Sequence, residues 1–319
     1  MKQTELTSRP VIARSSTSKW PRSPGIGILL FSGVLALAFF SSLLDLLLYS
    51  VNSDLYSYIP LIPFVSAYLI WLKKEDLRRL LDRSPKPALL ALASGAVVLI
   101  LYWILVGQGW QVNRNDKLTL MVSAFLSLLL GGGFLFLGVG AMRAIAFPAG
   151  ILFFMAPLPT FLASCITSFL QHTSAEAGYA LLNLVGEPIL RRGIIFQLSG
   201  ITIEVAEECS GIHSSLVLFI TSLLAGYLFL RTPWKRAVLT LAVVPLAILR
   251  NGFRIFTIAM LCVHVDPAMI DSPIHRRGGP IFFLISLVPF LALLFVLRRS
   301  ERQKNSSTGG NKGLAGKEP

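Results

Sequence analysis

The sequence predicts an all-α polytopic membrane protein with about eight transmembrane helices. Its 319 residues are 54% hydrophobic and only 14% charged, whereas roughly a quarter of the residues of a soluble domain are charged. Several apolar runs reach the ~20 residues that cross a bilayer as a helix. These observations exclude an ordinary soluble enzyme or binding domain.

The apolar runs follow one another along most of the chain. The predicted spans are 25–48, 59–72, 88–107, 118–139, 145–157, 212–230, 237–258 and 280–297. The second and fifth are the shortest, and both contain proline. The first run is too long for a signal-peptide core and ends without a small-residue cleavage site, so we expect it to remain as a helix.

Basic residues are distributed unevenly between the two sides of this topology. An even number of spans puts both termini on one side, and that side receives 21 of the 29 Lys and Arg residues. The positive-inside rule makes it the cytoplasmic side. The formal charge of +13 is thereby explained by topology, and no nucleic-acid partner is predicted.

The chain divides into three parts on this interpretation. A basic cytoplasmic tail over 1–24 precedes one membrane-embedded domain over 25–297, and a disordered cytoplasmic tail follows over 298–319. The last tail is rich in Asn, Ser, Gly and Lys, a composition that does not support a packed core.

One outer connection, residues 158–208, is much longer than the rest, at about 50 residues. It begins after Pro157-Leu158-Pro159, continues with an amphipathic helical pattern from Phe161 to Leu170, and then alternates polar and apolar residues from Gly193 to Val205. These patterns predict an interfacial helix and a short β-like ribbon before the sixth span.

Acidic residues and a thiol gather where this ribbon re-enters the membrane, in Glu207-Glu208-Cys209-Ser210-Gly211. A structural interpretation is available, because a free cysteine often packs in apolar surroundings and interfacial glutamates face water. The three cysteines, Cys165, Cys209 and Cys262, contain no C-x-x-C pair. A disulfide framework or a cysteine-based zinc site is therefore not expected.

The seventh span contains two arginines, Arg250 and Arg254, on one helical face. An arginine at membrane depth costs about 2.5–3.5 kcal/mol, so it normally faces a partner or a polar cavity. The alternative is snorkelling toward the outer headgroups, which would suit Arg250 better than Arg254.

His275 precedes the last span and lies on the same side as Cys209 and Arg254, at a similar predicted depth. A cysteine thiolate can act as a nucleophile, and a histidine can take its proton and return one to a leaving amine. An arginine can stabilise a thiolate or a developing oxyanion. The alternatives are an interfacial role for His275 and a base role for His264.

Three motifs in this order resemble those of the exosortases. Glu207 to Ile212 is similar to their E-x-C-S-G signature, Asn251 to Arg254 to their N-x-x-R motif, and His275 to Phe282 to their H-x-x-x-G-x-x-F segment. Two positions depart from the family pattern: His213 stands where an arginine is common, and Tyr58 where a histidine is common.

The resemblance implies an inner-membrane cysteine transpeptidase whose site faces the outer side. Cys209 would be the nucleophile, Arg254 the thiolate or oxyanion stabiliser and His275 the general acid/base. The supporting residues would be Glu207, Ser210, Gly211 and Asn251. No metal or other cofactor is expected.

Its substrates would be exported proteins that end in a PEP-like motif, a transmembrane helix and a basic tail. A thioester would then be resolved by water or by an acceptor amine.

The competing hypothesis is a non-enzymatic component of exopolysaccharide export, or a transporter. A transporter would be expected to have repeated half-sequences and charged residues near the bilayer midplane. No repeat is visible, and Asp45 is the one candidate for a midplane charge. A metalloprotease would need a motif such as H-E-x-x-H, which is absent.

Overall fold

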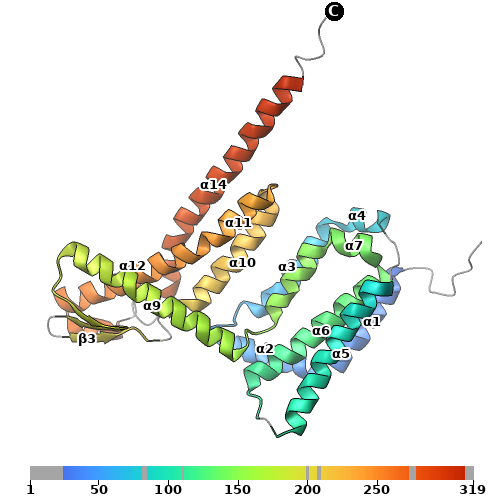
Figure 1. Ribbon diagram of the computed structural model, residues 1–319, viewed down its shortest axis with the longest axis horizontal. Helices are drawn as coiled ribbons and strands as arrows, with labels where there is room; N and C mark the ends of the chain where they lie inside the picture. Colours follow the sequence, from blue (N-terminus) through green and yellow to red (C-terminus); the bar gives the residue numbers. More distant parts are fainter. Residues whose placement is uncertain are drawn as a thin grey trace, which may run out of the picture.

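The computed structural model describes residues 24–80, 85–109, 111–198, 201–206, 210–272 and 278–312. This part of the chain is mostly helical, with a small antiparallel sheet between two helical groups (Figure 1). Within these described residues, five helices are long and apolar enough to cross a membrane, or up to seven if each of two bent pairs is one span. The basic tail predicted over 1–24 lies outside the described residues except for Pro24.

The first helical group covers the described residues up to Met155. Its elements are α1 (Pro24–Ala38), α2 (Phe40–Val51), η1 (Ile59–Leu61), α3 (Ile62–Leu72), α4 (Lys74–Arg79), α5 (Pro85–Gly107), α6 (Arg114–Phe136), α7 (Gly138–Ala144), α8 (Ala146–Ile151) and η2 (Leu152–Met155).

The second group begins after the Pro157-Leu158-Pro159 connection. It consists of α9 (Thr160–Val185), β1 (Leu190–Arg192), β2 (Ile195–Leu198), β3 (Ile201–Glu204), α10 (Ile212–Phe229), α11 (Pro233–Leu241), α12 (Val243–His264), η4 (Pro267–Asp271) and α14 (Gly279–Lys312).

All eight predicted apolar runs are largely helical, but several differ from a straight span. The first run is the pair α1–α2, bent by 72°, and the fifth belongs to a pair bent by 73° within residues 138–155. The second run, Ile59–Leu72, is helical but shorter than a spanning helix. The prediction of about eight spans thus compares with five to seven candidate spans in the described residues, because two of the runs are bent and Ile59–Leu72 is short.

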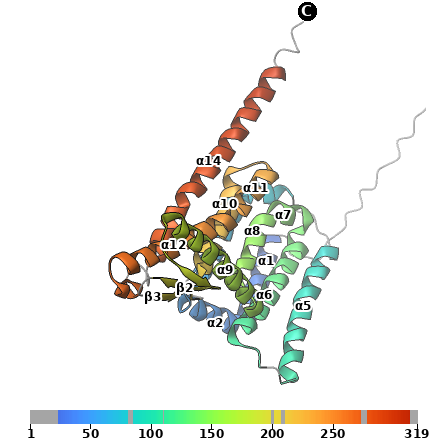
Figure 2. The same ribbon diagram turned by 60° about the vertical axis from the view of Figure 1, so that its left-hand side comes forward.

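The predicted outer segment is confirmed as a long helix, α9, followed by a three-stranded antiparallel sheet in the order β1-β2-β3. Phe196 on β2 pairs with Ile203 on β3, and both side chains are buried while Thr202 is exposed. The buried face joins one core cluster with residues of α9 and α12, so the sheet lies against these helices (Figure 2).

Helices α9 and α12 approach closely because small residues line their contact. A Cβ atom added to Gly252 would lie 2.5 Å from Cβ of Ala177, and one added to Gly178 would lie 3.0 Å from Cγ2 of Ile255. Small residues at such crossings let helix backbones come together. The glycine inside the Asn251–Arg254 motif is thus explained by packing.

The connection into α9 is held by side chains from the first group. Asn115 donates to the Leu158 carbonyl at 2.7 Å, and the Tyr56 hydroxyl donates to the same oxygen at 3.2 Å. Asp116 accepts from the amide of Thr160 at 2.7 Å, which satisfies one of the unpaired donors at the start of α9. The two helical groups are joined at this point.

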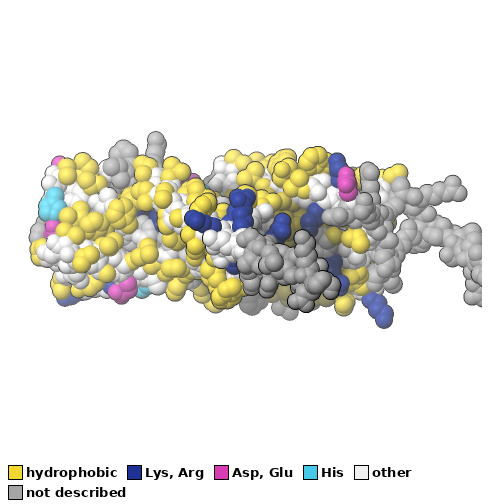
Figure 3. Space-filling model, turned by 90° about the horizontal axis from the view of Figure 1, so that it is seen from above, with side chains coloured by type: hydrophobic (Ala, Val, Ile, Leu, Met, Phe, Trp, Pro, Cys, Tyr) yellow, Lys and Arg dark blue, Asp and Glu magenta, His cyan; other side chains and the backbone are white. Residues whose placement is uncertain are grey.

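Several basic segments lie together toward the upper side of Figure 1, where α4, α7 and the α10–α11 turn are found. Lys73 Nζ donates to the Ala144 carbonyl at 2.8 Å, and Lys235 Nζ donates to the Leu297 carbonyl at 3.2 Å. Seen from above, Lys and Arg side chains gather among hydrophobic ones (Figure 3).

Helix α14 continues to Lys312, beyond position 297, where the sequence predicts a disordered tail. The Glu301 carboxylate accepts from the amides of Arg231 and Thr232 at 3.0 and 2.9 Å. These contacts give the helix extension a partner, the α10–α11 turn, that composition alone does not reveal.

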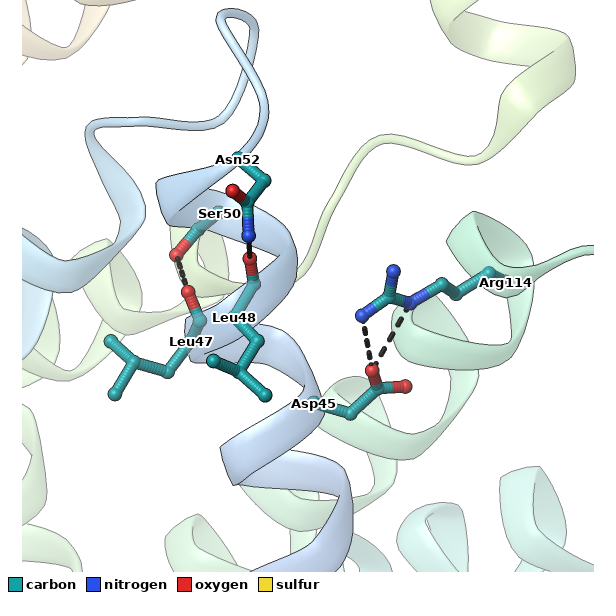
Figure 4. A network of polar contacts seen from close by, with 6 residues as sticks. All are labelled: Asp45, Leu47, Leu48, Ser50, Asn52 and Arg114. Carbon is teal, nitrogen blue, oxygen red and sulfur yellow. Dashed lines mark hydrogen bonds and ion pairs between the residues drawn. The ribbon is translucent and has the colours of Figure 1, made fainter.

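Asp45, the candidate midplane charge of the sequence interpretation, is paired with an arginine. The bend between α1 and α2 brings its carboxylate to Arg114 at the start of α6, where Oδ1 accepts from Nη2 at 2.5 Å and from Nε at 3.0 Å (Figure 4). The pair is partly exposed. Asp45 therefore gives no support to a transporter-like ion path.

Topology tags on either side of α5 test the orientation directly. A tag at position 83 is expected to report the cytoplasm, and a tag at Gly109 the outer side, because α5 is long and apolar enough to span the bilayer. Cysteine-accessibility labelling of the tagged chain measures this. Labelling of both tags from the same side would show that α5 does not span.

Candidate functional site

The last strand of the sheet ends at Glu204, just before the segment that contains the predicted nucleophile. The Val205 amide donates to the Ile194 carbonyl at 3.1 Å, and the Val205 carbonyl accepts from Nε2 of Gln171 on α9. Both Val205 and Gln171 are buried. Glu207, Cys209 and His275 lie outside the described residues, so the site is defined here by the residues that flank them.

Ser210 and Gly211 form the turn that enters α10. Ser210 is 1% exposed, and the Ile212 amide donates to its Oγ at 3.4 Å. Gly211 is the N-cap residue of α10 with φ +74° and ψ +18°, a left-handed conformation that favours glycine. The glycine of the E-x-C-S-G signature is therefore required by the backbone.

Arg250 of α12 donates hydrogen bonds to this turn and to the first turn of α10. Its Nη2 donates to the Gly211 carbonyl at 3.1 Å and to Ser215 Oγ at 3.3 Å. The residue is only 7% exposed, so the snorkelling interpretation is wrong for it. Arg250 is the functional candidate that sequence reasoning underrated, although its position on the same helical face as Arg254 was a usable signal.

Asn251 and Arg254 lie on the same helix as Arg250. Asn251 is 2% exposed, and its Oδ1 is 3.3 Å from the point where a Cβ atom of Gly211 would stand. Arg254, half-buried, follows Arg250 by about 6 Å along the helix axis. Asn251 of the second motif therefore lies against Gly211 of the first.

The two positions that depart from the family pattern also lie near this turn. His213 is half-buried in the first turn of α10, with Nε2 3.5 Å from Ser57 Oγ in the loop after α2. Tyr58 packs against the cluster of Ile62, Ile151 and Ile220, and burial raises the pKa of its phenol to about 12. Tyr58 is therefore neutral at physiological pH.

His264 does not share this location. It ends α12, ten residues after Arg254, which is about 15 Å along the helix axis. Its Nε2 is paired with the Glu187 carboxylate in the connection after α9. Of the cysteines in the described residues, Cys262 is buried in the core, as expected of a packing residue, while Cys165 is exposed on α9.

Gly211→Ala is expected to reduce both activity and stability. The added Cβ would stand 2.7 Å from Arg250 Nη2, and the positive φ itself strains any L side chain by about 1–2 kcal/mol. Substrate turnover and thermal unfolding in detergent measure the two effects. Gly109→Ala is the matched control, because Gly109 has φ +79° but open space around it. Equal behaviour of the two variants would show that contact with Arg250 is unimportant.

A family model for transmembrane exosortases of the EpsH type matches residues 50–292, more than half of the chain. The chain belongs to the transmembrane exosortase family. No curated protein and no solved structure gives a significant match. Membership implies a multi-pass membrane protein that processes PEP-CTERM proteins, in a family regarded as transpeptidases. The matched range of this exosortase includes the Ser210-Gly211 turn and the Asn251–Arg254 motif.

Proposed function

We propose that this exosortase is a cysteine transpeptidase that cleaves the C-terminal sorting signal of PEP-CTERM proteins through a thioester. The observation that supports the proposal is the contact between the Ser210-Gly211 turn of the first motif and residues Arg250 and Asn251 of α12. Arg250 holds the Gly211 carbonyl, and Asn251 lies against the same glycine. The residue two positions before Gly211 is Cys209, so the candidate nucleophile is attached to a rigid turn.

Each proposed catalytic residue has a defined task. The Cys209 thiolate attacks the carbonyl carbon of the scissile peptide bond, and His275 takes the thiol proton and delivers it to the leaving amine. The C–N bond breaks, the motif remains as a thioester on Sγ, and the transmembrane helix with its basic tail departs. Water or an acceptor amine then displaces the thiol.

The surrounding charges favour this chemistry. Arg250 contacts the turn, and Arg254 follows one helical turn later on the same face of α12. Nearby cations lower the pKa of a cysteine thiol. The neighbouring Glu207 and Glu208 act in the opposite direction when ionised. We expect Arg254 to stabilise the thiolate and the oxyanion, while Glu207, Ser210, Gly211 and Asn251 support the turn.

The site faces the outer side of the cytoplasmic membrane in this proposal, and both termini are cytoplasmic. The substrate helix docks from within the bilayer, so its motif reaches the outer interface while its basic tail stays inside. This geometry follows from the tripartite signal, whose hydrophobic segment has to span the membrane next to the enzyme.

Coexpression with a reporter tests the proposal. The reporter ends in a PEP-type motif, a transmembrane helix and a basic cluster, and mass spectrometry follows its C-terminus. Wild type and Cys165→Ala should both remove the tail, since Cys165 is an exposed cysteine on α9. Cleavage that is also retained by Cys209→Ala would contradict a thiol mechanism.

A further inference from the structure

Arg250 has a hydrogen-bonding group that the turn does not use. Its Nη2 is bonded to Gly211 and Ser215, but the buried Nη1 has no partner among the described residues. Both bonded partners are neutral. A guanidinium 93% removed from solvent, as the exposure of 7% implies, is costly without an anion beside it.

The start of α10 adds to this positive environment. Its N-cap residue is glycine and contributes no side-chain hydrogen bond to the helix, and of its first amides that of Ile212 donates to Ser210 Oγ at 3.4 Å. The N-terminus of a helix carries partial positive charge and exposes amide donors, which makes it favourable for anions. α10 is 18 residues long, and its first turn lies directly against Arg250.

No acidic side chain neutralises Arg250 in the described part of the chain. The ion pairs found there join Arg114 to Asp45, Arg191 to Glu176, and His264 to Glu187. None of them includes Arg250, whose polar contacts are a carbonyl and a hydroxyl. Among the described residues, Arg250 at the junction of α10 and α12 therefore has no anionic partner.

We propose that Arg250 and the N-terminus of α10 form a carboxylate subsite, and that its ligand is the glutamate side chain of the substrate's PEP motif. The inference rests on the proposed function. Two peptide units separate Cys209 from Gly211, so their Cα atoms lie within about 8 Å of each other. A motif cleaved at Cys209 therefore passes within side-chain reach of Arg250.

The geometry favours the motif glutamate over the oxyanion as the occupant. Nη2 of Arg250 already holds the Gly211 carbonyl, and Nη1 is enclosed, so the side chains beside Nη1 must shift as the substrate docks. Such a rearrangement fits a recognition step, in which a desolvated charge pair contributes strongly to discrimination. An oxyanion forms only after the substrate is in place.

A charge-swap experiment in full-length protein tests the subsite. Three PEP-type reporters carry glutamate, glutamine or lysine at the central motif position, and each is coexpressed with wild type, Arg250→Gln or Arg250→Glu. Arg114→Gln is the control, because Arg114 is an arginine that pairs elsewhere. Membrane abundance of every variant and the fraction of reporter cleaved are measured.

Wild type and Arg114→Gln should prefer glutamate over glutamine by about tenfold or more, the factor that corresponds to roughly 1.4 kcal/mol. Arg250→Gln should remove this preference, and Arg250→Glu should cleave the lysine reporter better than the glutamate reporter. Equal cleavage of the glutamate and glutamine reporters by wild type would overturn the subsite without any variant.

The remaining outcomes separate the two proposals. If Arg250→Gln slows all reporters equally and keeps the wild-type preference, Arg250 serves only the turn or the oxyanion, and the glutamate subsite is wrong. If wild type cleaves none of the reporters, the proposed function fails and the subsite fails with it. Cysteine-dependent cleavage without a glutamate preference rejects the subsite alone.

Discussion

Replacing Cys209 by alanine should abolish reporter processing while the protein stays folded in the membrane. The thiol supplies the attacking electron pair, and losing a catalytic nucleophile typically reduces turnover by a factor on the order of 10⁴ to 10⁶. The substitution removes one atom from the residue before the buried Ser210, so the turn held by Arg250 should persist. Reporter mass spectrometry and membrane abundance measure the two effects.

Matched cysteine variants complete this prediction. Cys262→Ala should keep the site but weaken the core, because Cys262 is 1% exposed in the cluster between the sheet and α12. Cys165→Ala should change neither activity nor stability, since its side chain is exposed. Full processing by Cys209→Ala at normal abundance would reject the thioester mechanism.

Arg254→Lys should reduce processing by a factor on the order of 10² to 10³, the usual effect of removing one oxyanion donor. Lysine keeps the positive charge but lacks the planar guanidinium group, which can donate hydrogen bonds to two oxygen atoms at once. Rate measurements over a range of reporter levels should show a loss in kcat with little change in KM, because the oxyanion exists only in the transition state.

The control for Arg254→Lys is Arg114→Lys, which preserves charge at a partly exposed pair far along the chain. It should process the reporter at the wild-type rate. Near-normal turnover by Arg254→Lys would mean that Arg254 only anchors α12, and that another donor stabilises the oxyanion.

Hydropathy and charge predicted most of the helices, since both reflect the energetics of burial in lipid. The alternating pattern after Gly193 likewise predicted the β2–β3 hairpin. The bend between α1 and α2 could not be predicted, because the apolar run is continuous there. It depends on contacts that α2 makes with α6, through residues such as Leu46 in the first core cluster, and these are remote in sequence.

At the candidate site, too, contacts between residues remote in sequence could not be predicted. The sequence singled out Gly211 and Asn251 by their motifs, and the structure brings them together. Arg250 was underrated because its partner, the Gly211 carbonyl, is 39 positions away, and a single sequence contains no record of that contact. Gly252 stands inside the Asn251–Arg254 motif, yet its close approach to Ala177 gives it a packing role.

Hydroxylamine trapping tests the central claim most directly. A thioester at Cys209 would react with hydroxylamine, so the cleaved reporter should end in a hydroxamate when membranes containing wild type are treated during turnover. Mass spectrometry distinguishes that product from a free carboxylate. The hydroxamate is expected with wild type and with Cys165→Ala, and none is expected with Cys209→Ala. A reporter cleaved by wild type that never acquires the hydroxamate would contradict a thioester at Cys209.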